Sequence, residues 1–242
     1  MIEDKVREKM DALLLDFVIA MRELYGEDLV SLYRFGDSST PLGRPKLLAL
    51  MRQIGLEQLR KYAAVNSKWA KKGIAAPLML TRKTLETSAD VFPMEFLEMK
   101  ETGRLLYGED LLSGLEIGLD NMRRQCEEQV KGKMLHLRQG YMEIGGNAKE
   151  TAALIAASIE PFTEVMRNVL RLMSKPVPQK KDAIIAAFCT ATGISEKPFA
   201  EALRLYYRVG KLPDKEVDAL FSRYLYEVGL MAEKIDNMVP GV

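Results

Sequence analysis

The sequence is poor in several residues on which common chemistries depend. Its 242 residues include two cysteines, Cys126 and Cys189, one histidine, His136, and one tryptophan. The cysteines stand 63 residues apart without a CxxC pair, which argues against a zinc site and against a disulfide framework. We therefore expect both thiols to be buried in the core as small apolar groups.

The sequence also lacks an excess of charge of one sign and a long hydrophobic run. Lys and Arg number 35 and Asp and Glu number 34, a net charge of +1, so no global field attracts DNA, RNA or an acidic membrane. No apolar run reaches the roughly 20 residues of a membrane span, and acids stand where a secretory signal needs a basic flank. We expect a cytoplasmic protein with no membrane and no nucleic-acid partner.

The first 114 residues combine helical and strand patterns. Apolar residues recur every three or four positions in 3–25 and in 56–72, which predicts two amphipathic helices. Strands are predicted over 29–35, 75–80 and 90–99, with a short helical turn at 81–87. The apolar run 46–51 fits a strand or a helix by periodicity alone.

From residue 115 onward only helical patterns remain. Helices are predicted over 115–144, 148–173, 180–192, 196–209 and 214–237, separated by glycine and proline. The fold class is therefore α+β, with a mixed sheet and flanking helices over residues 1–114 and an all-helical bundle over residues 115–242.

Four segments carry a resemblance to a known family. They are the loop Gly36-Asp37-Ser38 after a predicted strand, AAPLMLT at 75–81, DVFPMEFLEM at 90–99 and RLLYGEDLL at 104–112. In these features and their order the sequence resembles the minimal nucleotidyltransferase family, and within it the kanamycin nucleotidyltransferase group. The resemblance implies a small mixed sheet followed by a helical bundle.

The resemblance also implies two-metal nucleotidyl transfer. In that family a Gly-Ser pair after the first strand holds nucleotide phosphates through backbone N–H groups, and two carboxylates spaced one apart on the second strand bind magnesium. Alternate strand residues face the same side, so they can bind the same metal pair. A third carboxylate comes from a later strand, and Glu95 in DVFPMEF matches it better than Asp90 or Glu98 does.

The sequence departs from the family pattern at the metal-binding positions. Gly36-Asp37 stands in place of Gly-Ser, and Gly43-Arg44-Pro45-Lys46 in place of Ser-Asp-x-Asp. At about 4 Å a unit cation and a dication repel by roughly 8 kcal/mol at an effective dielectric of 20. We therefore expect no bound metal and little or no transferase activity.

Two sets of residues remain candidates for a site. Gly36, Asp37, Ser38, Arg44 and Lys46 are a candidate phosphate site, and the alternative is a surface turn in which Asp37 and the serines cap their own backbone. Glu95 is the candidate catalytic remnant. The alternative for Glu95 is an ion pair with Arg44 or Lys46.

These patterns favour a nucleotidyltransferase-like protein that has lost catalysis and is retained for nucleotide sensing or protein association. One alternative is an active transferase that uses Mg²⁺ and a nucleoside triphosphate and recruits the metal through Asp37, Asp90 and Glu95. Another alternative is an interaction module in which the helical bundle forms a homodimer or binds an unidentified protein partner.

Overall fold

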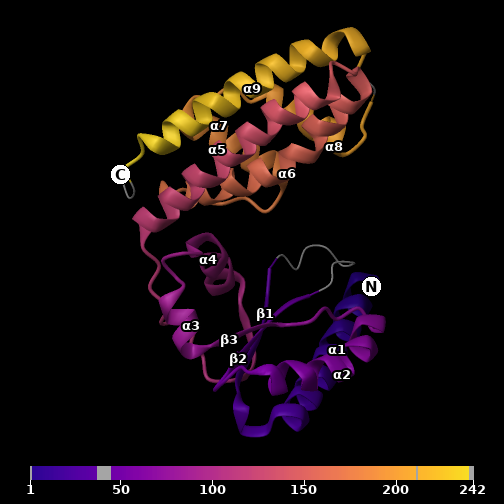
Figure 1. Cartoon of the computed structure of the whole chain (residues 1–242), viewed down its shortest axis with the longest axis vertical. Helices are drawn as coiled ribbons and strands as arrows, with labels where there is room; N and C mark the ends of the chain where they lie inside the picture. The colour runs from indigo at the N-terminus through magenta and orange to yellow at the C-terminus, as the bar shows by residue number, and fades with distance from the viewer. Residues whose placement is uncertain (1, 37–44, 211, 240–242) are drawn as a thin grey trace. The chain divides into compact units, whose positions relative to one another are not determined.

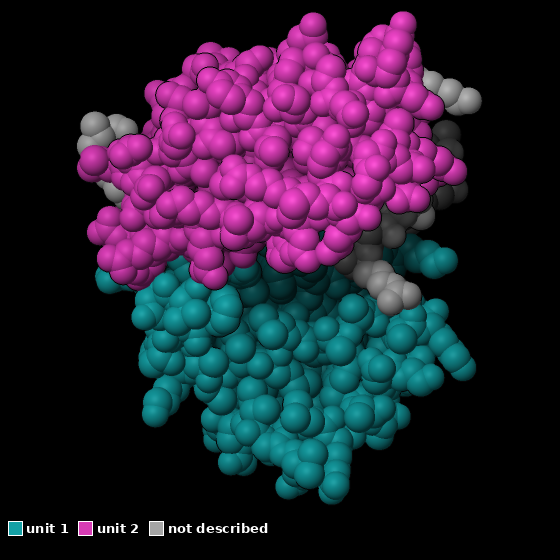
Figure 2. Space-filling model, turned by 45° about the horizontal axis from the view of Figure 1, so that its top comes forward, with its two compact units in different colours: residues 1–117 teal, residues 118–242 magenta. Residues whose placement is uncertain are grey.

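The computed structural model describes residues 2–36, 45–210 and 212–239, with side chains from residue 8 onward in the first helix. The chain divides into two compact units, an N-terminal unit of residues 1–117 and a helical unit of residues 118–242 (Figure 2). Within the described ranges, no helix combines the length and the hydropathy that crossing a membrane requires.

The N-terminal unit is built on a four-stranded sheet in the order β3-β2-β1-β4 (Figure 1). The strands are β1 (Leu29–Phe35), β2 (Lys46–Met51), β3 (Leu78–Thr81) and β4 (Arg104–Gly108). β1 pairs antiparallel with β2 and β4, and β2 pairs parallel with β3. The run 46–51, which fitted a strand or a helix, is a strand because its alternate residues enter two different cores.

Helices cover both faces of this sheet. They are α1 (Ile2–Tyr25), the 3₁₀ helix η1 (Gly26–Asp28), α2 (Leu56–Lys71), α3 (Arg82–Thr87) and α4 (Pro93–Thr102). One core joins α1 and α2 to the sheet and includes an edge-to-face contact of Phe17 with Trp69, with ring centroids 4.9 Å apart. The other core joins α3 and α4 to the opposite face through Leu85, Phe96 and Met99.

The prediction of a strand over residues 90–99 is wrong, because this segment is a turn followed by α4. Pro93 occupies the first turn of α4, where the missing N–H of proline has no helical partner to lose. Pro93, Phe96 and Met99 recur every three positions and are buried, which is the helical period. The edge strand β4, which the periodicity did not predict, follows immediately.

The helical unit contains α5 (Leu119–Ile144), α6 (Ala148–Leu172), α7 (Lys181–Thr192), α8 (Lys197–Tyr206) and α9 (Asp214–Asp236). All five lie within a few residues of the predicted ranges. Their ends follow local chemistry: Gly145 and Gly193 end α5 and α7 in the left-handed conformation, and the Asn147 side chain accepts a hydrogen bond from the Glu150 N–H at the start of α6.

Helix α6 is the centre of the helical unit and contacts α5, α7, α8 and α9. Its buried Phe162 meets the Tyr224 ring of α9 edge to face, and Phe199 of α8 meets the same ring. The Tyr224 hydroxyl lies 2.9 Å from the Ser158 hydroxyl, so the one polar atom of this ring has a partner.

Both thiols are buried, as expected, and burial raises the pKa of the Cys189 thiol to about 12. A thiol with so high a pKa is protonated at neutral pH and is therefore a poor nucleophile.

Candidate functional site

The candidate site lies where β1 ends and β2 begins. Phe35 and Lys46 are partners in the antiparallel register, so Gly36 and Lys46 lie side by side at this end of the sheet. Asp37, Ser38 and Arg44 lie outside the described residues. The site is therefore described through Gly36, Lys46 and the helix beside them, α4.

An ion pair joins Lys46 to α4. The Lys46 Nζ lies 3.1 Å from Oε1 and 3.2 Å from Oε2 of Glu98, so the ammonium contacts both carboxylate oxygens. The same Nζ lies 5.7 Å from the centroid of the Phe35 ring, within cation–π range. The Lys46 side chain is 59% exposed and that of Glu98 is 27% exposed, so solvent screens the pair.

The backbone N–H of Gly36 also has a partner on α4. It donates to the Thr102 hydroxyl at 2.9 Å, and that hydroxyl donates to the Glu98 carbonyl at 2.6 Å. Gly36 adopts a φ of +84°, which favours glycine, and a Cβ there would lie 3.2 Å from Cδ of Lys46. Gly36, Lys46, Glu98 and Thr102 thus form one network, which we call the β1–α4 network.

The structure places Glu95 on a helix instead of a strand. Glu95 is exposed in the first turn of α4, three residues before Glu98, so the alternating strand on which it was expected does not exist. Lys46, which was one expected partner of Glu95, pairs with Glu98. Asp90, in the turn before α4, is exposed as well.

The face of β2 that follows Lys46 is apolar. Leu48 and Leu50 alternate with Lys46 on this face, and both are fully buried in the core against α3 and α4. Among the described residues, no group of three or more His, Cys, Asp or Glu side chains could hold a metal ion. The described residues by themselves therefore do not form the carboxylate set of a two-metal centre.

The phrase LYGEDLL anchors the edge strand to β1. The Glu109 carbonyl accepts hydrogen bonds from the Ser31 hydroxyl at 2.6 Å and from the Tyr33 hydroxyl at 2.8 Å. Gly108 adopts a φ of +87°, and a Cβ there would lie 1.9 Å from the carbonyl oxygen of Val30. Only glycine fits this close approach of β4 to β1.

The Tyr33 hydroxyl has a second role beside this anchor, because it also accepts a hydrogen bond from the N–H of Leu111 at 2.7 Å. Burial raises the pKa of Tyr33, while the hydrogen bonds from the backbone of Leu111 and Leu112 lower it in part. The motif that carried the family resemblance therefore has a structural function in this chain.

Known proteins give one informative comparison. No protein-family model and no curated protein sequence matches this chain. A solved structure of the spectinomycin adenyltransferase AAD(9) from Enterococcus faecialis, with ATP and spectinomycin, superposes with a TM-score of 0.54 at 13% identity, over 93% of this chain and 98% of that one. This chain has a nucleotidyltransferase-like fold. The predicted α+β class, a mixed sheet followed by helices, is confirmed.

At 13% identity the likeness shows the fold alone, and it transfers no ligand and no activity to this chain. The most informative site residues, Glu98 and Thr102, were not singled out from the sequence as partners of the loop. Both depend on α4 being a helix, since Glu98 and Thr102 are four residues apart and share one helical face. The signal that could have found them is the proline at the start of an i, i+3 apolar pattern.

Proposed function

We propose that this protein binds nucleotides without transferring them. Where the family that the sequence resembles has metal-binding carboxylates, this chain has Lys46. The ammonium of Lys46 binds nucleotide phosphates in place of magnesium. The observation that carries the proposal is the contact of Lys46 with both carboxylate oxygens of Glu98 at the start of β2. A side chain positioned in this way supplies one positive charge but coordinates no metal.

The Glu98 carboxylate occupies the Lys46 ammonium when no nucleotide is bound. An exposed ion pair contributes roughly 0–1 kcal/mol, so a phosphate group can displace the Glu98 carboxylate from Lys46 at little cost. Phosphate oxygens are strong acceptors for an ammonium donor. Glu98 then acts as an internal competitor that the nucleotide displaces, which is a simple basis for sensing nucleotide concentration.

Calorimetric titration of the full chain with ATP tests this proposal. We expect saturable binding in the presence of EDTA as well as Mg²⁺, because the charge partner is Lys46. Lys46→Glu should abolish binding, whereas Glu98→Gln should strengthen it by removing the competitor. Lys83→Glu, a charge reversal at an exposed lysine of α3, is the matched control and should bind like the parent.

Binding that requires Mg²⁺ and survives Lys46→Glu would contradict the proposal. That outcome would support an active transferase with an unusual carboxylate set, in which Asp90 and Glu95 contribute. Asp90 and Glu95 are both exposed, and neither joins a cluster of three acids within the ranges that the structure describes.

A second candidate function, protein association, is supported by the surface of α5. Leu135 is 60% exposed and Met142 is 73% exposed, and these residues are seven apart, so they lie on the same face of the helix. Light scattering with Leu135→Gln/Met142→Gln tests this candidate. A parent oligomer that the double variant reduces to a monomer would support self-association through this face, and a monomeric parent would reject it.

A further inference from the structure

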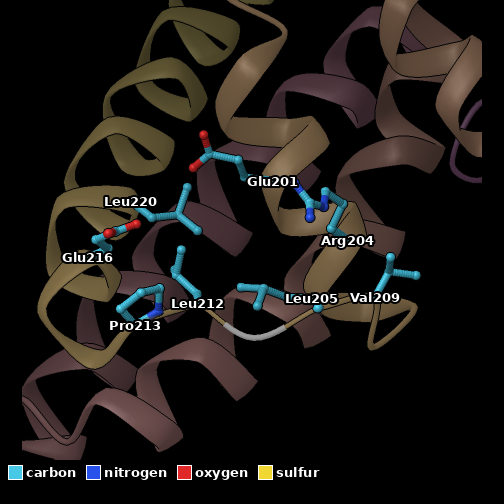
Figure 3. A pocket seen from close by; sticks show the side chains of 9 residues that line it. Glu201, Arg204, Leu205, Val209, Leu212, Pro213, Glu216 and Leu220 are labelled. Atoms are coloured by element: carbon cyan, nitrogen blue, oxygen red, sulfur yellow. The ribbon is translucent and has the colours of Figure 1, made fainter.

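A pocket of about 230 Å³ lies in the helical unit, between α8 and α9 and beside the segment that joins them (Figure 3). It belongs to one unit and is unrelated to the β1–α4 network. Its lining combines leucine, proline and valine side chains with three charged residues. The lining residues are Glu201, Arg204, Leu205, Val209, Gly210, Leu212, Pro213, Glu216 and Leu220.

The pocket has an apolar wall and one cation turned toward it. Leu205, Leu212 and Leu220 come from α8, the connecting segment and α9 respectively, and their side chains point toward one another in Figure 3. Leu220 is fully buried, which fixes the floor of the pocket. The guanidinium of Arg204 faces the same space from α8 in Figure 3.

Among the lining charges, Arg204 differs from Glu201, because the described residues provide no ion-pair partner for it. The Glu201 carboxylate accepts from Nη2 of Arg223 at 3.0 Å, so its charge is balanced inside the unit. No ion pair to Arg204 is present in the part of the chain that the structure describes. Glu216 and Arg204 are both exposed at the edge of the pocket, so water partly screens both charges.

The connecting segment reverses the direction of the chain next to this guanidinium. Arg208 adopts a φ of +56° and Gly210 a φ of +81°, and the Val209 N–H donates to the Arg204 carbonyl at 2.9 Å, which reverses the chain at the end of α8. A Cβ on residue 210 would lie 3.4 Å from Nη2 of Arg204. Gly210 and the guanidinium of Arg204 are therefore close neighbours in the lining of the pocket.

The volume limits the size of a ligand. An apolar cavity of about 150 Å³ accommodates benzene, so a pocket of about 230 Å³ accommodates an aromatic ring with a short chain. The lining side chains limit the charge of the ligand, because the guanidinium of Arg204 next to an apolar wall favours a planar anion such as a carboxylate.

We propose that the α8–α9 pocket binds a small monocarboxylate with an aromatic or branched apolar body. The carboxylate contacts the guanidinium of Arg204, and the apolar body packs on Leu205, Leu212 and Leu220. This inference is independent of the proposed nucleotide binding, because it concerns another unit and another charged group.

Titration of the full chain with three isosteric probes, followed by calorimetry and ligand-observed NMR, tests the inference. The probes are 3-phenylpropionate, its neutral amide and 3-phenylpropylamine. We expect saturable binding of the acid and at least about tenfold weaker binding of the amide, because a hydrogen bond to a charged group is lost. Preferential binding of the amine would assign the pocket to Glu216 and overturn the inference.

Variants locate the bound acid. Arg204→Gln should weaken binding of 3-phenylpropionate by about tenfold or more, whereas Arg138→Gln, a matched change at an exposed arginine of α5 outside the lining, should leave it unchanged. Leu212→Trp, which fills the pocket and keeps every charge, should abolish binding. Thermal melts of each variant confirm that it is folded.

Equal affinity of the parent and Arg204→Gln, binding that survives Leu212→Trp, or no saturable binding of the acid up to about 10 mM would each overturn the inference. The nucleotide titration of the parent chain is unaffected by all three outcomes, so the two proposals fail separately.

Discussion

Among the described residues, Lys46 at the end of the N-terminal sheet and Arg204 at the α8–α9 pocket are two cations that are held differently. Lys46 contacts both oxygens of Glu98, and the neighbouring Gly36 N–H donates to Thr102, so the polar groups of this end have partners within the unit. Arg204 faces an apolar pocket without an ion pair in the described ranges. A ligand must displace the Glu98 carboxylate to bind Lys46. At Arg204 it displaces no carboxylate of the described residues.

The largest effect on stability is expected where β4 approaches β1 most closely, in the sheet that carries the β1–α4 network. Gly108→Ala should lower the free energy of unfolding by at least about 3 kcal/mol, because the new Cβ would lie 1.9 Å from the Val30 carbonyl oxygen. Gly73→Ala is the matched control, since Gly73 has a similar φ of +88° but no atom within 4 Å of its Cβ position.

For Gly73→Ala we expect a loss of about 1–2 kcal/mol, the cost of a left-handed residue alone. Urea denaturation of both variants measures the difference. Equal losses would mean that β4 moves away from β1 freely and that the anchoring of LYGEDLL is weak.

The next effect distinguishes two buried tyrosines on opposite faces of the sheet. Tyr33→Phe removes the hydroxyl that donates to the Glu109 carbonyl and accepts from the Leu111 N–H, so we expect a loss of about 1–3 kcal/mol. The Tyr62 hydroxyl is buried with no hydrogen-bond partner in the described chain, so Tyr62→Phe should be neutral or stabilising. Chemical denaturation measures the free energy of unfolding of both variants. A larger loss for Tyr62→Phe than for Tyr33→Phe would contradict this prediction.

Tyr62 also makes the stability of the chain depend on pH. Burial raises the pKa of Tyr62 from 10.0 to about 12, with the nearby Tyr25 adding to the shift. Because the folded state favours the neutral phenol, the contribution of this group to stability is complete below pH 10 and is lost between pH 10 and 12. Melting temperatures of Tyr62→Phe should therefore fall less over this interval than those of the parent, and parallel curves would count against the assignment.

The smallest effect on stability is expected at the ion pair itself. Lys46→Met should change the free energy of unfolding by less than about 1 kcal/mol, because the pair is largely exposed. The same variant should lose ATP binding. A change of several kcal/mol would instead show that the pair is mainly structural and that Lys46 is not available to phosphates.

How far the sequence predicted this molecule differs between the two units. The helices of the helical unit followed from their 3.6-residue period and from Gly145 and Gly193, because these signals are local. In the N-terminal unit, the alternation around Pro93 favoured a strand until tertiary burial selected the helix α4.

The candidate site was predictable in part. The position of Lys46 at the start of the second strand followed from the family resemblance, because the apolar run 46–51 alone fitted a strand or a helix. The pairing of Lys46 with Glu98 joins residues 52 apart and depends on the helix that was missed. The α8–α9 pocket left no signal in the periodicity, because it depends on the left-handed backbone of Arg208 and Gly210.

Pyrophosphate release by the full chain, with each of the four nucleoside triphosphates in Mg²⁺ and in Mn²⁺, tests most directly whether nucleotidyl transfer is lost. We expect no release above the protein-free background, because Lys46 stands at the start of β2, where the family that the sequence resembles carries a metal-binding carboxylate. Release that depends on the metal and is abolished by Glu95→Gln would contradict it.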